Sequence, residues 1–147
     1  MHGLLPRLVI AVSFGSLLAS SPASPQMRPT NAEITQGPVL ELAVEDLAII
    51  RWTTTTPGGS DEHFGVGHYG TDPKELSQIA QSHIRLNRGH AETIFRVRLD
   101  GLAPHTTYFY TVTSMESSGQ TNGVESPVCQ FTTPGPGERI VAYPQPR

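Results

Sequence analysis

The segment from residue 100 to residue 112 constrains the fold more than any other part of the chain. Leu102, Pro104, Thr106 and Tyr108 stand at every second position, which is the spacing of an extended chain with two distinct faces. We interpret Leu102 as closing the end of a two-layered β-structure and Pro104 as turning the chain between its layers. The ring of Tyr108 is then buried while its hydroxyl bonds to the backbone just upstream, the arrangement called a tyrosine corner.

Six further segments have the pattern of short strands. Around Trp52, the side chains of Ala48 and Ile50 fall on the same face, whereas Ile49 and Arg51 fall on the other. Turn-forming glycine, proline and aspartate separate the segments. Residues 74–82 fit either a short helix or an irregular strand. The expected strands cover residues 34–42, 47–52, 64–69, 93–99, 107–113 and 128–132, with 74–82 as the seventh candidate. The chain is therefore predicted to be all-β, a two-sheet antiparallel sandwich of about seven strands.

Composition supports one small β domain and excludes some classes of function. The chain has 147 residues with 14 glycines and 13 prolines, and only 16% of its residues are charged, against a usual ~25%. The formal net charge of −3 argues against a nucleic-acid partner. A single cysteine, Cys129, excludes an internal disulfide and a cysteine-based zinc cage.

The first residues have the layout of a secretory signal peptide. His2 and Arg7 give a weakly basic start, residues 8–19 are mostly apolar and uncharged, and small residues follow at 20–24. The apolar run is shorter than the ~20 residues that cross a bilayer, so no membrane span is expected after cleavage. We therefore expect a signal peptide at 1–23, a linker at 24–31, the sandwich at 32–134 and a flexible tail at 135–147. The expected location is secreted or periplasmic.

Several sequence blocks resemble a known family. Residues 100–112 and the position of Trp52 resemble fibronectin type III domains, which belong to the immunoglobulin-like sandwiches. The order of five blocks is similar to the N-terminal domain of purple acid phosphatases: Ile34-Thr-Gln-Gly-Pro38, Ile50-Arg-Trp-Thr53, Val66-Gly-His-Tyr-Gly-Thr71, Val97-Arg-Leu-Asp-Gly-Leu102 and Phe131-Thr-Thr-Pro134. The signature residues of the fold are Trp52, Leu102, Pro104, Thr106, Tyr108, Tyr110 and Val112.

The resemblance implies an accessory role, not a catalytic one. In purple acid phosphatases, two metal ions in a following domain hydrolyse phosphate esters. The ligand blocks of that domain, such as Gly-Asp-x-Gly and Gly-Asn-His-Asp/Glu, do not occur in this sequence. We therefore expect no catalytic, cofactor-binding or metal-binding residues, no cofactor and no enzymatic activity. The expected partner is an unidentified protein or glycan. The alternative is a truncated or partner-dependent accessory domain of a metal-dependent acid phosphatase, whose partner is a catalytic phosphatase domain.

Two surface groups are weaker candidates for sites. Asp61, Glu62 and His63, together with His68, are metal-ligand residue types, but His63 and His68 lie five apart and so on opposite faces of a strand. A solvated loop is the favoured interpretation of this group. The second group, Arg51, Arg96 and Arg98, is expected on the outer face of one sheet. That face is either an anion-binding patch or, as we favour, a solvated face balanced by Glu41 and Glu45.

The remaining candidates have plain structural interpretations. His90 and His105 occupy turns and are expected to be exposed. Cys129 is expected to be half-buried, and no Ser/His/Asp or Cys/His set supports catalysis at it; pairing between chains is the other role weighed for it. Gly65 and Gly67 lie within a strand and not before a helix, which excludes a phosphate-binding loop.

Overall fold

The computed structural model describes residues 32–121 and 125–142 of the chain. Within these ranges the structure is all-β and contains no helix. Its strands are β1 (Ile34–Ala43), β2 (Leu47–Thr55), β3 (Glu62–Gly70), β4 (Gln78–Arg85), β5 (Glu92–Asp100), β6 (Thr107–Glu116), β7 (Cys129–Thr132) and β8 (Ile140–Val141). No helix in the described ranges is long and apolar enough to cross a membrane.

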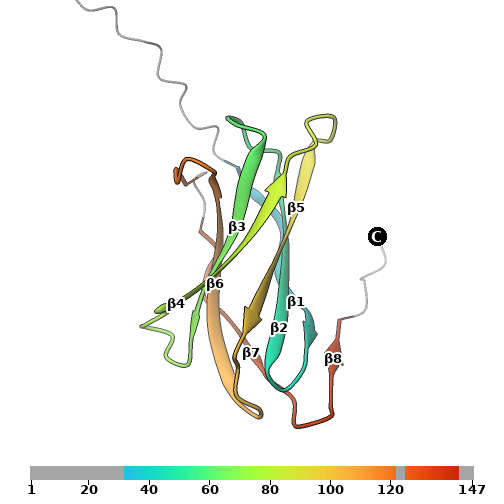
Figure 1. Cartoon of the computed structure of the whole chain (residues 1–147), viewed down its shortest axis with the longest axis vertical. Helices are drawn as coiled ribbons and strands as arrows, with labels where there is room; N and C mark the ends of the chain where they lie inside the picture. The colour runs from blue at the N-terminus through green and yellow to red at the C-terminus, as the bar shows by residue number, and fades with distance from the viewer. Residues whose placement is uncertain (1–31, 122–124, 143–147) are drawn as a thin grey trace, which may run out of the picture.

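The strands form two antiparallel four-stranded sheets that pack as a sandwich (Figure 1). The first sheet has the order β5-β2-β1-β8 and the second has the order β4-β3-β6-β7. The prediction of an all-β, immunoglobulin-like sandwich is therefore confirmed. The choice left open for residues 74–82 is also resolved, because β4 is a strand that pairs with β3 along its whole length. The expected signal peptide (1–23) and linker (24–31) lie outside the described residues.

The core follows from alternation along the strands. Every second side chain of β5 is buried, and the same face of β2 buries Ala48, Ile50 and Trp52. Trp52 stacks on Phe95 with ring centroids 5.4 Å apart and an interplanar angle of 13°. Burial of each such large side chain stabilises the fold by roughly 1.5–3 kcal/mol. These side chains of the first sheet are the bulk of the core.

Glycines on β3 make room for this bulk from the opposite sheet. A Cβ on Gly65 would lie 3.0 Å from Trp52 Cη2 and 3.2 Å from Phe95 Cδ1, and a Cβ on Gly67 would lie 3.2 Å from Val97 Cγ1. Large side chains of one sheet thus pack against bare backbone of the other, which keeps the interior dense.

The corner between β5 and β6 carries the chain from the first sheet to the second. The Tyr108 hydroxyl accepts a hydrogen bond from the Ala103 N–H at 2.8 Å, the contact expected of a tyrosine corner. Thr133, just after β7, accepts a hydrogen bond from the Thr106 N–H at 2.9 Å and donates to the Ala103 carbonyl at 2.6 Å. Leu102 is buried, and its N–H bonds to the Asp46 carbonyl at 2.9 Å. The corner is thereby fixed to both neighbouring turns.

The chain after β7 crosses back to the first sheet. It turns at residues 135–138 and forms β8, which pairs with β1 through Leu42–Val141 and Ala43–Ile140. This strand lies within the stretch 135–147 that was expected to be a flexible tail, and its pairing is a structural feature that the sequence did not indicate. The exposed Ile140 and Val141 have no strong strand alternation around them.

Candidate binding surface at the loop end

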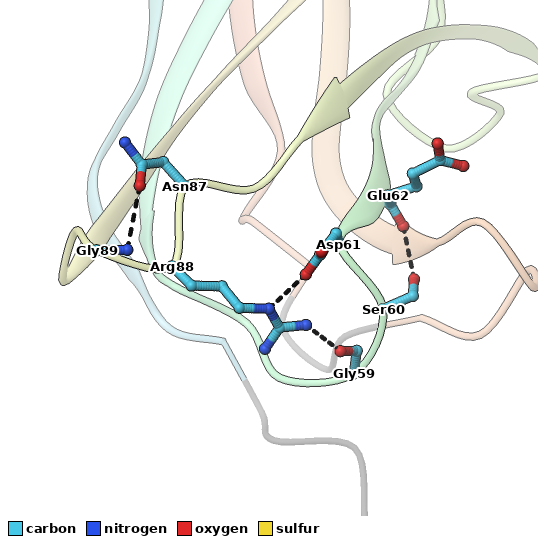
Figure 2. Close-up of polar contacts among 7 residues, drawn as sticks. All are labelled: Gly59, Ser60, Asp61, Glu62, Asn87, Arg88 and Gly89. Atoms are coloured by element: carbon cyan, nitrogen blue, oxygen red, sulfur yellow. Dashed lines mark hydrogen bonds and ion pairs between the residues drawn. The ribbon is translucent and has the colours of Figure 1, made fainter.

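Two loops meet at the end of the sandwich opposite the β5–β6 corner (Figure 1), and Figure 2 shows the polar contacts there. The β2–β3 loop and the β4–β5 loop are joined by Arg88, whose guanidinium donates hydrogen bonds to the Asp61 carboxylate and to the Gly59 carbonyl. We call Gly59, Asp61 and Arg88 the loop clasp. A backbone hydrogen bond from the Leu86 N–H to the Asp61 carbonyl at 2.7 Å fixes the same two segments.

Each loop also has its own internal turn. The Ser60 hydroxyl donates to the Glu62 carbonyl at 2.9 Å. In the other loop, the Asn87 side-chain oxygen accepts the Gly89 N–H at 3.1 Å, and the Asn87 carbonyl accepts the His90 N–H at 3.0 Å. Short polar side chains that bond to the backbone two residues on are typical of ordered turns. The loop end is therefore a defined polar surface on a rigid sandwich, the usual setting of binding residues.

Arg88 controls the charge state of the clasp. Its hydrogen bond to the Asp61 carboxylate, followed by its positive charge, holds the pKa of Asp61 below the ordinary value of 3.8. Both side chains are about half exposed, so solvent screens the ion pair. Asp61 is thus ionised at neutral pH and is already engaged by Arg88.

His63 departs from the prediction of a solvated loop. β3 begins at Glu62, two residues earlier than expected, so His63 points to the inner face and is fully buried. Neither of its ring nitrogens has a hydrogen-bond partner. Burial lowers the pKa of His63 below the ordinary value of 6.5. The solvated-loop interpretation is wrong for His63, although Asp61 and Glu62 are exposed as it required.

The suspected metal ligands are not brought together. His68 lies on the outer face of β3, opposite to His63, as the five-residue spacing predicted. In the described ranges, no three side chains of the types histidine, cysteine, aspartate or glutamate are grouped so as to hold a metal ion.

The three arginines share one outer face, as predicted. Arg51 and Arg96 are directly opposite in the β2–β5 register. The Glu41 carboxylate lies between them, 3.5 Å from Arg51 Nε and 2.9 Å from Arg96 Nε. Arg98 pairs with Asp100 at 2.7 Å. Glu41 therefore balances this face, whereas no ion pair joins Glu45 to these arginines in the described part of the chain.

The other candidates occupy ordinary surroundings. Cys129 is half-buried, as expected, and burial raises the pKa of its thiol, which disfavours the reactive thiolate. His90 and His105 are exposed at turns. A shallow hollow of about 420 Å³, lined by Glu33, Ile34, Gly37, Glu125, Ser126 and Pro127, was not indicated by any sequence pattern.

The signature residues lie where the sandwich needs them. Trp52, Leu102, Tyr108, Tyr110 and Val112 are buried, Thr106 is partly buried and Pro104 is exposed at the corner. A family model for the purple acid phosphatase N-terminal domain matches residues 37–133, about two-thirds of the chain.

The chain belongs to the purple acid phosphatase N-terminal domain family.

No curated protein matches the chain. Among solved structures, it is similar to the sensor domain of the anti-sigma factor RsgI4 in Pseudobacteroides cellulosolvens. A solution structure of that domain has 18% identity and a TM-score of 0.47, with 72% of this chain and 76% of that chain covered. A structure of a shorter form of the same sensor domain has 22% identity and a TM-score of 0.42, with 67% and 97% covered.

The family match concerns the accessory domain alone. It spans the strands from residue 37, near the start of β1, to the end of β7 and includes the tyrosine corner, and no catalytic domain of the family is matched. The ligand blocks of that catalytic domain are also absent from the sequence. The family match therefore identifies a β-sandwich module of the purple acid phosphatase N-terminal type.

Proposed function

We propose that this chain is an exported, noncatalytic module that binds or positions another molecule through its loop end. The observation that carries the proposal is the family match over the sandwich in a sequence without the metallophosphatase ligand blocks. Export is supported by the basic start, the apolar run at residues 8–19 and the small residues that follow.

The loop end is the surface that this proposal assigns to binding. Asp61, Arg88, Asn87 and His90 are exposed there on two loops that are held by the clasp. A polar, pre-ordered surface loses little conformational entropy on binding, which favours recognition by hydrogen bonds. The proposed partner is a protein or a glycan with polar groups on its surface.

A second candidate function is specific to the family. The module accompanies a catalytic phosphatase domain, on its own chain or on a separate one, and the match to a domain that precedes such a catalytic unit favours this role. In both cases phosphate ester hydrolysis is performed elsewhere.

Two experiments test the proposal. Purified residues 24–147 are assayed with a phosphate monoester in the presence of iron, zinc or manganese, and no turnover is expected. Turnover that a chelator abolishes would overturn the noncatalytic role. Export is tested by fusing residues 1–23 to a reporter enzyme, and a reporter retained in the cytoplasm would contradict it.

The surface is tested by photo-crosslinking. A crosslinking residue at Ser60, on the loop end, is compared with one at Gln81, an exposed site on β4. For a protein partner, we expect a crosslinked adduct only with the change at Ser60. For a glycan partner, we expect only the change at Ser60 to block binding to a glycan array. Equal capture at both sites would remove the loop end from the proposal.

A further inference from the structure

His63 is an unusual residue to find inside this sandwich. Its imidazole is fully buried at the loop end, and neither ring nitrogen makes a hydrogen bond. The backbone of Gly58 lies near the ring and favours its protonated form, but neither nitrogen meets the distance and angle of a hydrogen bond. Buried polar groups are nearly always satisfied, so an unsatisfied one in a native structure calls for an explanation.

Charged groups from three segments face this imidazole. Glu116 of β6 is its register partner across the strands, Asp61 precedes it on the β2–β3 loop, and Arg88 reaches it from the β4–β5 loop. Arg85 at the end of β4 acts on Asp61. Glu116 and Asp61 favour a proton on the ring, whereas Arg88 and burial oppose it, and burial is the largest of these effects.

The β2–β3 loop, whose Gly58 backbone lies near His63, contacts the same charged groups. Gly59 has a positive φ of 89° and lies against the Glu116 carboxylate, so closely that a Cβ at Gly59 would overlap it. Arg88 holds the Gly59 carbonyl and the Asp61 carboxylate from the other side. Asp61 and Arg88, which act on His63, thus form the loop clasp, and Glu116 packs against Gly59 of the same clasp.

We propose that His63 makes the loop end an acid-sensitive latch, closed while the imidazole is neutral and open once it binds a proton. A buried imidazolium without a partner is unstable until water or a carboxylate reaches it. Asp61 reaches it by leaving Arg88, Glu116 reaches it by leaving its position against Gly59, and water reaches it when the loop that carries Gly59 lifts. Each route disturbs the contacts that hold the loop end closed, while the tyrosine corner at the other end is unaffected.

The direction of the pH effect follows from the lowered pKa. Because the closed form disfavours protonation, the stabilisation of the closed state by neutral His63 is fully present above pH 6.5, the ordinary histidine value. This stabilisation is lost as the pH falls from 6.5 to the lower pKa of the closed form. Across that window the opening equilibrium increases by about tenfold per pH unit, because one proton is taken up on opening. This effect does not depend on which partner the loop end binds.

Hydrogen exchange on the full chain tests the latch. The amides of Leu86 and Ser117 donate to the carbonyls of Asp61 and Glu62 and so report on the loop end, and the Thr133 amide reports on the tyrosine corner. From pH 7.5 to 4.5, protection factors corrected for intrinsic exchange should fall at Leu86 and Ser117 and stay level at Thr133. Level protection at all three amides would overturn the proposal.

Two substitutions separate the latch from general acid sensitivity. His63→Phe keeps a buried ring that takes no proton, and its loop amides should stay protected down to pH 4.5. His68→Phe makes the same change on the outer face of the same strand and should behave as the wild type does. Loss of protection at the loop amides of His63→Phe at acid pH would contradict the proposal.

A titration of the wild-type protein covers the case in which His63→Phe does not fold. Imidazole carbon resonances give the pKa of each histidine by nuclear magnetic resonance. We expect His63 to titrate below the ordinary histidine value of 6.5, with its transition matching the loss of protection at Leu86. A pKa of His63 at or above 6.5 would overturn the proposal.

Discussion

The hydroxyl of Tyr108 has a structural role that its ring does not have. The ring fills space beside Phe131, with centroids 5.8 Å apart, whereas the hydroxyl satisfies the Ala103 N–H at 2.8 Å. That amide belongs to the irregular corner and has no ladder partner. The hydroxyl therefore replaces a backbone hydrogen bond at the point where the chain changes sheets.

Replacing Tyr108 by phenylalanine tests this role. The change keeps the ring and leaves the Ala103 N–H unsatisfied, and it should lower the free energy of unfolding by about 1–3 kcal/mol. Urea unfolding of the two proteins measures the difference. Tyr69→Phe is the matched control, since its hydroxyl makes only a 3.4 Å contact with the Asp100 carbonyl. Equal losses in both variants would argue against a special role for the corner.

The bare backbone at Gly65 is a second residue-scale requirement. A Cβ there meets Trp52 at 3.0 Å and Phe95 at 3.2 Å, two rings that are stacked and have little room to move. Gly65→Ala should destabilise the protein by roughly 1–3 kcal/mol through overpacking. Gly89→Ala, in an exposed turn, serves as the control and should have a much smaller effect. If Gly65→Ala has the same midpoint of thermal unfolding as the wild type, the two sheets can move apart enough to accommodate a Cβ at this position.

At the scale of the strand, the outer face of the first sheet depends on Glu41. Two arginines directly opposite each other repel, and Arg51 and Arg96 hold that position with Glu41 between them. Because these side chains are partly exposed, each ion pair contributes little to total stability. The main effect of Glu41 is to offset the repulsion between the two arginines where β1, β2 and β5 lie side by side.

Glu41→Gln should therefore destabilise the sandwich by less than about 1 kcal/mol in low salt, and by less still in high salt. Urea unfolding at the two salt concentrations measures the difference. Adding Arg96→Gln should restore much of the loss, because it removes the repulsion that Glu41 offset. A loss that is independent of salt, or that the second substitution does not restore, would point to packing and not to charge.

The elements show how far the sequence predicts the fold. Alternation placed β2 and β5 correctly because each buries one face along its length, and β6 was found from the alternating aromatic residues at its start although both of its faces are buried in the middle. Residues 74–82 stayed ambiguous because β4 is an edge strand whose side chains are mostly exposed, so it has little apolar pattern. The position of β8 depends on pairing with β1, a partner almost a hundred residues away, and no local signal encodes it.

At the scale of the whole molecule, the two ends of the sandwich differ in the groups that hold them: neutral groups at the tyrosine corner, and charged groups with a buried histidine at the loop end. The tyrosine corner is made by neutral groups within a short segment and Thr133, which is why the sequence predicted it. The loop end brings together His63, Glu116 and Arg88 from separate strands and loops. The burial of His63 was missed because it depends on where β3 begins and on the loop that covers it, neither of which is visible in the residues around it.

The route of the chain through β8 has a mechanical consequence. A tensile load applied beyond residue 142 reaches β8 first, which is held to β1 by two register pairs and the Ala142 N–H to Glu41 carbonyl bond at 3.0 Å. Only after β8 has peeled away does the load reach Thr133 and the corner. Single-molecule pulling should show a short, low-force extension before the main rupture, and a single rupture would contradict it. Under tension, β8 therefore detaches first and lengthens the chain by a few residues while the core stays intact.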